Sequence, residues 1–119
     1  MDWWNNAGAV VTVAMGCLGL FLPARAAALT GLSPTSVEAR AEFRGTLGVT
    51  FLFLGAMPLI TQEALVFLTV GFAWLGAGLG RVVSIAVDGG NTGKNWGAVA
   101  FEGVIAALLI AGAPLAALV

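Results

Sequence analysis

The chain has 119 residues, of which 60% are hydrophobic and only 9% are charged. A soluble globular domain is about half apolar and about one quarter charged, so this composition and a mean hydropathy of +1.00 indicate a membrane protein. The net charge of −1 provides no basic surface for nucleic acid, and the absence of histidine removes the commonest metal ligand and general base. One cysteine cannot form an intramolecular disulfide. We expect no metal, no cofactor and no catalytic residues.

Four hydrophobic segments follow one another along the chain, each close to the roughly 20 residues that a helix needs to cross about 30 Å of hydrocarbon. They cover residues 4–22, 38–60, 64–87 and 97–118. Pro23 is expected to end the first segment and Ser36 to cap the second, while a polar, glycine-rich loop precedes the fourth. Because the connections are short, neighbouring helices are expected to run antiparallel. The sequence therefore predicts a single all-α domain, an integral membrane four-helix bundle.

The charges are distributed unevenly between the two ends of this predicted bundle. The end with both termini has Asp2 and Glu63 but no positive residue. All five positive residues lie on or near the other end: Arg25, Arg40, Arg44, Arg81 and Lys94. The positive-inside rule then predicts a cytoplasmic location for that end and periplasmic or extracellular termini. We expect a multi-pass protein of the bacterial inner membrane, with the first segment retained as a span because Asp2, and no cation, precedes it.

Three charged residues lie deeper than the loops. Arg44, Arg81 and Glu102 are each about six or seven residues from the cytoplasmic end of a different predicted helix, which places them roughly 9–10 Å below that end. Because charges in a membrane helix are costly, we expect them to pair. The predicted buried charge network contains five residues: Arg44, Arg81, Glu102, Glu42 and Asp88.

Three interpretations of these charges stay open at this point. They form a structural clamp between helices, or they line a site open to the cytoplasm for an anionic headgroup or small polar ligand, or the arginines extend separately towards water. Trp74 and Ser84 are candidate ligand or lipid contacts. Trp74 lies near the middle of the third segment, where its indole N–H needs a partner, and Ser84 lies between Arg81 and Asp88 on one polar stripe.

Glycines predict where helices approach closely. Small residues allow membrane helices to pack backbone to backbone, either within the bundle or against another chain. The candidate packing residues surround the two arginines of the second and third segments: Gly45, Gly48, Gly76, Gly78 and Gly80.

Several short motifs carry a resemblance to a known family. The sequence Phe21-Leu22-Pro23 closes the first segment, and Ala41-Glu42-Phe43-Arg44-Gly45 opens the second. Gly80-Arg81 and Asp88-Gly89 close the third segment, and Phe101-Glu102 lies in the fourth. This order resembles an uncharacterised bacterial family of four-helix integral membrane proteins, a domain of unknown function that is distantly similar to DoxX-like membrane proteins. The resemblance implies a four-span fold and the importance of Arg44, Arg81, Asp88 and Glu102, and it implies no activity.

The functional prediction is a small non-enzymatic membrane protein that acts as an accessory or structural subunit of a larger complex or of a homo-oligomer. Its expected partners are membrane lipids and other membrane subunits or itself, without nucleic acid. The alternative is a bundle that binds a lipid or quinone, with Arg44 and Arg81 as polar handles and Trp74 deeper in the pocket. A small transporter is less favoured. Small multidrug exporters have a similar length and four spans but rely on a glutamate in the first helix, and the first segment here has none.

Overall fold

The computed structural model describes residues 1–119, and all of its regular structure is helical. Its elements in chain order are α1 (Trp3–Phe21), α2 (Pro23–Thr30), α3 (Val37–Arg44), the π-helical turn η1 (Gly45–Val49), α4 (Thr50–Thr61), α5 (Ala64–Val87), α6 (Gly93–Ile110) and the short 3-10 helix η2 (Leu115–Leu118). The predicted all-α class is therefore confirmed.

Four helices are long and apolar enough to cross a membrane. They are Trp3–Phe21, Val37–Thr61, Ala64–Val87 and Gly93–Ile110. The second of them is one continuous helix made of α3, η1 and α4. Large apolar side chains are exposed along all four, among them Trp3, Val10, Phe53, Ile60, Phe72, Val83 and Val104. Contiguous apolar surface of this kind is unfavourable in water and suits contact with lipid, as in a small multi-pass membrane protein.

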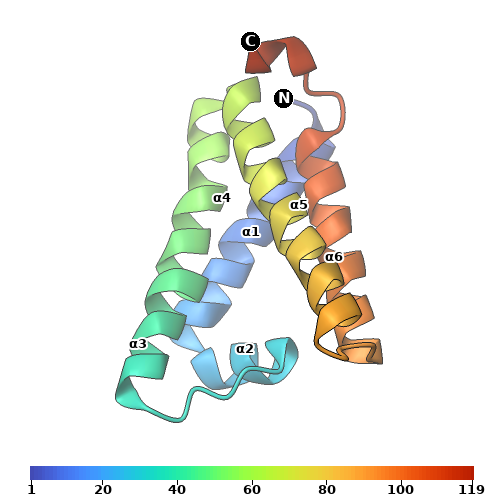
Figure 1. Cartoon of the computed structure of the whole chain (residues 1–119). Coiled ribbons are helices and arrows are strands. Elements are labelled where there is room, and N and C mark those ends of the chain that lie inside the picture. Colours follow the sequence, from blue (N-terminus) through green and yellow to red (C-terminus); the bar gives the residue numbers. More distant parts are fainter.

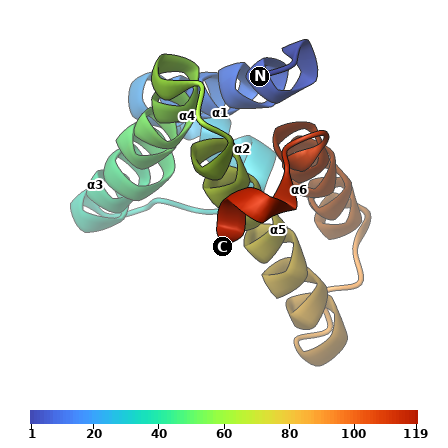
Figure 2. The same ribbon diagram turned by 90° about the horizontal axis from the view of Figure 1, so that it is seen from above.

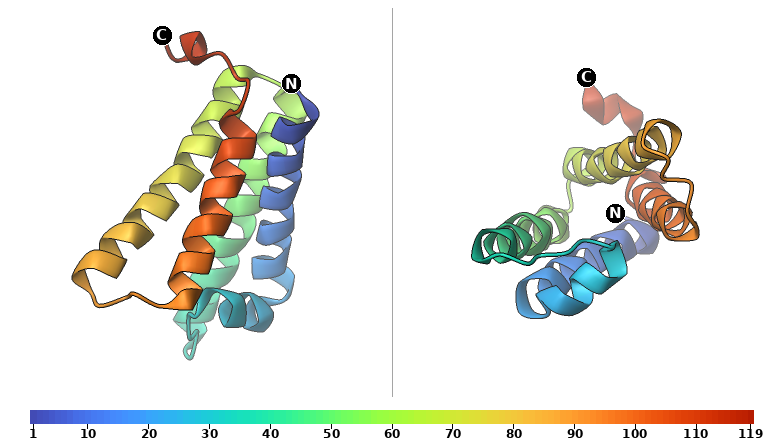
Figure 3. Two further views of the ribbon diagram at one scale, coloured as in Figure 1. Left: turned by 90° about the vertical axis from the view of Figure 1, so that its right-hand side faces the viewer. Right: turned by 60° about the horizontal axis from the view of Figure 1, so that its bottom comes forward.

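The four long helices surround a common interior, and the two termini lie at the same end of the bundle (Figure 1). At this end the Met1 amino group donates to Gln62 Oε1 at 3.1 Å, and Trp4 Nε1 donates to the Ala111 carbonyl at 2.9 Å. The short helix α2 lies across the opposite end, beneath α1 and α6 (Figure 3). Viewed from above, α4 and α5 converge at the end with the termini, whereas α3 and the lower part of α5 lie far apart (Figure 2).

Helix α1 and the second span pack against each other through glycine. A Cβ on Gly16 would lie 2.7 Å from the Gly48 carbonyl oxygen, and a Cβ on Gly55 would lie 2.6 Å from the Ala9 carbonyl oxygen. Gly19 is equally close to the backbone of the second span. These distances leave no room for any side chain, so the two backbones are in direct contact.

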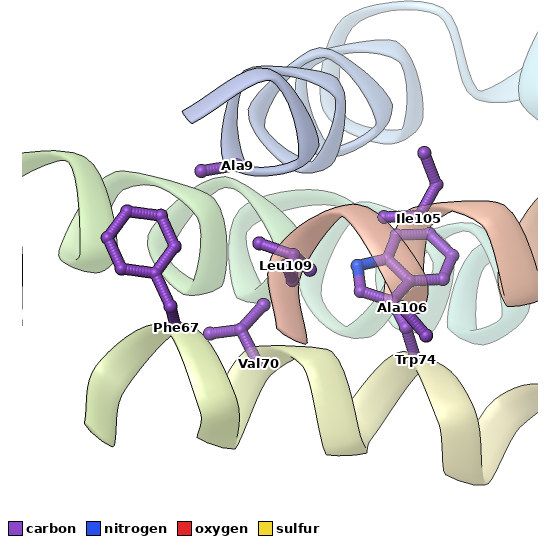
Figure 4. Close-up of a cluster of buried hydrophobic side chains, with 7 residues drawn as sticks. All are labelled: Ala9, Phe67, Val70, Trp74, Ile105, Ala106 and Leu109. Carbon is purple, nitrogen blue, oxygen red and sulfur yellow. The ribbon is translucent and has the colours of Figure 1, made fainter. Parts of the chain in front are cut away.

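A second contact surface forms the main core, where α5 and α6 meet α1. Seven buried side chains make up this core: Ala9, Phe67, Val70, Trp74, Ile105, Ala106 and Leu109 (Figure 4). Trp74 Nε1 donates to Thr12 Oγ1 at 2.9 Å, so the polar atom of the largest core side chain is satisfied inside the bundle.

The second and third predicted spans, 38–60 and 64–87, agree with the structure to within a residue at each end. The fourth differs, because α6 covers Gly93–Ile110 instead of residues 97–118. Thr92 Oγ1 accepts a hydrogen bond from the Asn95 N–H, which starts the helix earlier. Gly112 has a φ of 74°, a left-handed conformation that ends the helical path, and Pro114 follows it.

The segment after Pro23 also differs from the sequence prediction, which treated it as a connection. Leu22 leaves the helical conformation with φ −129° and ψ 59°, and Pro23 starts the eight-residue helix α2. Proline suits the first position of a helix because the N–H that it lacks has no partner there, and Gly31 ends α2 with a φ of 80°. The result is a short helix that covers one end of the bundle.

Candidate functional site

A cavity of about 390 Å³ lies in the half of the bundle next to α2; we call it the chamber. Ala26, Leu29 and Thr30 of α2 line one side of it. Apolar side chains from α1, from the second span and from α5 and α6 form most of its wall: Met15, Phe43, Leu47, Phe51, Trp74 and Phe101. The ionisable residues that line it are Arg81, Lys94 and Glu102. The chamber therefore joins an apolar interior to a charged group, as small-molecule sites do.

Aromatic rings form the inner wall of the chamber. The ring centroids of Phe51 and Trp74 are 5.2 Å apart with an interplanar angle of 52°. Those of Trp74 and Phe101 are 6.0 Å apart in a T-shaped arrangement. Because these three rings come from α4, α5 and α6, they set the spacing of three helices around the cavity.

Arg81 of α5 and Glu102 of α6 form an ion pair at the edge of the chamber. Arg81 Nε donates to Glu102 Oε1 at 2.9 Å, and Arg81 Nη2 lies 3.5 Å from Glu102 Oε2, so the contact is two-pronged. Arg81 Nη1 also donates to Asn95 Oδ1 at 3.2 Å. The side chain of Glu102 is 10% exposed and that of Arg81 is 28% exposed. Glu102 thus has a cationic partner for its buried charge.

Lys94 contributes the second cation of the chamber. It belongs to the first turn of α6, and its Nζ donates to the Ala28 carbonyl of α2 at 2.8 Å. The last carbonyls of a helix lack partners within that helix, and a cation near them is favourable. Lys94 therefore ties the start of α6 to the end of α2, across one side of the chamber.

The structure does not bring Arg44 and Glu42 into the same network. Arg44 Nη1 donates to the Leu20 carbonyl at the end of α1, and its side chain is exposed. Glu42 Oε1 accepts from Thr46 Oγ1 at 2.8 Å on its own span. Arg44 satisfies a terminal helix carbonyl, as Lys94 does for α2. Equal depth in the sequence does not place these side chains next to Arg81, because the chamber separates α3 from α5.

Ser84 and Asp88 form a local pair near the end of α5. Ser84 Oγ donates to Asp88 Oδ2 at 2.7 Å, one helical turn apart. Neither residue lines the chamber. The carboxylate of Asp88 therefore accepts from Ser84, whereas Arg81 turns towards Glu102.

The sequence profile of a family described as a domain of unknown function, DUF4345, matches residues 2–113, which include all six α-helices. The chain belongs to the DUF4345 family. Membership confirms the expected relationship to a family of unknown function. No curated protein matches the chain, and no solved structure matches it. The function of this DUF4345 protein is therefore argued from the geometry of the chamber.

The glycines predicted to pack helices divide into two groups in this DUF4345 protein. Gly48 packs against the backbone of α1, and Gly78 lies beside Glu102, whose Cβ would be 3.7 Å from an added Cβ. The other three do not pack within the chain, because an added Cβ would meet no atom within 4 Å: Gly45, Gly76 and Gly80. Gly76 and Gly80, which form a G-x-x-x-G pair on α5, face away from the bundle. Trp74 and Gly78 occupy the face of α5 that packs inward.

Two residues of the chamber edge were not predicted as site residues. Asn95 lies seven residues before Glu102, so a helix over both places them on one face, and this spacing is a usable signal. Lys94 reaches the chamber through its contact with α2, and its role follows only once α2 is recognised as a helix. No group of three or more potential ligands is arranged to hold a metal ion in this DUF4345 protein.

Proposed function

We propose that this DUF4345 protein is a non-enzymatic multi-pass membrane protein that binds an amphipathic molecule from the bilayer in the chamber. The observation that carries this proposal is the combination of an aromatic cavity wall with a charged edge. Trp74, Phe51 and Phe101 offer apolar contact for a tail, while Arg81 and Lys94 offer N–H donors for a polar head. A lipid and a quinone both have this general form.

A second proposed function is that of an accessory subunit or a homo-oligomer. The observation that favours it is the outward face of α5, where Gly76 and Gly80 have open space above them. A helix of another chain could approach this backbone closely, as small residues allow in membranes. Crosslinking through cysteines placed at Leu75 or Leu79, both exposed on α5, would detect such a neighbour.

The proposed orientation places the chamber in the cytoplasmic half of a bacterial inner membrane. The spans alternate in direction, so that Lys94 and α2 are near the cytoplasm and Asp2 and Glu63 are outside. The bacterial origin and the distant similarity to DoxX-like membrane proteins belong to the same proposal. A reporter enzyme fused after Val119 tests the orientation, and activity on the cytoplasmic side would contradict it.

The test of ligand binding uses a substitution that fills the chamber. Ala98 lines the cavity, whereas Ala100 is exposed on the same helix and does not line it. We expect native mass spectrometry of gently extracted wild-type protein to show a retained small-molecule adduct. Ala98→Phe is expected to abolish that adduct, and Ala100→Phe is expected to retain it.

Thermal melting in the same detergent controls for folding of both variants. A folded Ala98→Phe protein that keeps the adduct at the wild-type level would contradict binding in the chamber. Loss of the adduct from both variants would equally contradict it, because the bound molecule would then not depend on the cavity.

A further inference from the structure

The ionisable residues of the chamber do not balance one another. Arg81 and Lys94 are positive at neutral pH and Glu102 is the one carboxylate among the lining residues, so the chamber has one net positive charge. Glu102 already makes an ion pair with Arg81. Lys94 has no carboxylate partner, and its one hydrogen bond is to the neutral carbonyl of Ala28.

Hydrogen-bond donors also outnumber acceptors at this edge. A guanidinium has five N–H groups, and Arg81 uses three of them on Glu102 and Asn95. An ammonium has three, and Lys94 uses one on Ala28. Four N–H donors on these two side chains are therefore left for other acceptors. A molecule with several acceptor oxygens would complement them.

The surroundings strengthen the preference for a negative group. Lys94 belongs to the first turn of α6, and Gly97 and Ala98 of the next turn also line the chamber, so the positive end of the helix dipole lies at its edge. Lys94 is exposed at this edge, and a bound anion would give it a partner of opposite charge. Nine of the fourteen residues that line the chamber are hydrophobic, so the part of the bound molecule beyond its anionic group must be apolar.

We infer that the ligand is a single-tailed amphiphile with a small anionic head, a carboxylate or a phosphate monoester. Lys94 and Arg81 bind the head, and the hydrocarbon tail lies against Trp74, Phe51 and Phe101. This inference rests on the proposed function and narrows it, because a neutral quinone would leave the charge of Lys94 without a partner.

The experiment compares compounds that share one tail and differ in the head. Dissociation constants of hexadecanoate, hexadecyl phosphate and hexadecanol are measured by native mass spectrometry titration of the full chain in detergent. We expect at least one of the two anions to bind about tenfold or more tightly than hexadecanol, the ratio that a hydrogen bond to a charged group supplies. The anion that binds more tightly identifies the head as a carboxylate or a phosphate.

Substitution of the unpaired cation gives a second readout. Lys94→Gln is expected to reduce the preference for the anion over hexadecanol to near unity, whereas Lys94→Arg is expected to retain it. Arg40→Gln is the matched control, because Arg40 is an exposed cation of α3 that does not line the chamber. The Arg40→Gln variant should prefer the anion over hexadecanol as strongly as the wild type does.

The outcomes separate the inference from the proposed function. Equal binding of hexadecanol and both anions to the wild type overturns the anionic head but leaves an amphiphile site in place. Saturable binding of none of the compounds, together with an unchanged adduct in Ala98→Phe, overturns both. Because the comparison of heads on wild-type protein needs no substitution, it stands even if Lys94→Gln loosens α2.

Discussion

Trp74 of α5 donates its indole N–H to Thr12 Oγ1 of α1 at 2.9 Å, and Thr12 in turn donates its hydroxyl proton to the Gly8 carbonyl at 2.8 Å. Thr12 is fully buried and Trp74 is 6% exposed, so both bonds are shielded from solvent. This pair joins the aromatic wall of the chamber to the helix that packs most closely against the second span. Removing the hydrogen bond between Trp74 and Thr12 tests how much it contributes to the stability of that wall.

Thr12→Val removes the acceptor while keeping the shape of the side chain. We expect the free energy of unfolding to fall by about 1–3 kcal/mol, because the buried indole N–H then lacks a partner. Thr12→Ser keeps the oxygen and should lose clearly less. Thermal melting of both variants in one detergent checks the difference, and equal loss in the two would contradict a role for the hydrogen bond.

Gly55→Ala tests the backbone contact between α1 and α4. The added Cβ would lie 2.6 Å from the Ala9 carbonyl oxygen and from the Val13 amide nitrogen, and backbone atoms cannot rotate away. We expect a destabilisation of about 1–3 kcal/mol or more, as for overpacked cores. Gly76→Ala is the control, since its Cβ would meet nothing within 4 Å, and it should leave the melting temperature unchanged or slightly raised. A larger loss of stability in Gly76→Ala than in Gly55→Ala would contradict the close backbone contact.

Asn5→Asp tests how the end of α6 is held. Asn5 Nδ2 donates to the carbonyls of Leu108, Leu109 and Ala111 at 2.9, 3.1 and 2.8 Å, and the residue is fully buried. The side chain of aspartate has no N–H donor and would bring a negative charge to these carbonyls. We therefore expect the free energy of unfolding to fall by about 1–3 kcal/mol.

The neighbouring Asn6→Asp provides the matched comparison, because Asn6 donates to exposed carbonyls of Met1 and Asp2. It should cost much less than Asn5→Asp. Hydrogen exchange across residues 107–113 locates the effect: protection there should drop in Asn5→Asp alone, and equal protection in both variants would rule out the predicted role.

Arg81→Met and Glu102→Leu test the ion pair in a double-mutant cycle. Each single substitution leaves the other charge without its partner within the bundle, so each should destabilise the protein. The double variant should lose less than the sum, with a coupling of about 0.5–3 kcal/mol. Unfolding free energies of the four proteins measure it, and additive losses would show that the two side chains act separately.

The sequence predicted the parts of the fold that depend on hydropathy and depth. The second and third spans follow directly from apolar length, and the equal depth of Arg81 and Glu102 anticipates that they meet. Hydropathy alone placed the end of the fourth span too late, because Ala113 to Val119 are apolar but follow the left-handed Gly112. Backbone conformation, not polarity, ends that helix.

Depth also failed to predict the partner of Arg44. Arg81 and Glu102 lie on adjacent helices, whereas Arg44 lies on a span whose path changes at η1, where the Thr50 N–H donates to the Gly45 carbonyl five residues back. Such a wide turn shifts the faces of a helix relative to the regular spacing. The side chain therefore reaches the end of α1, and only three-dimensional contacts could reveal this.

The contact between α1 and the second span has a mechanical consequence. Where Gly16 and Gly55 bring two backbones together, there are no rotamers to rearrange, so this half of the molecule is stiff. Adjustment to bound molecules of different length therefore falls to flexible side chains that line the cavity, such as Met15 and Lys94. The packing of α1 on the second span thus stays fixed, while the shape of the cavity adapts through its side chains.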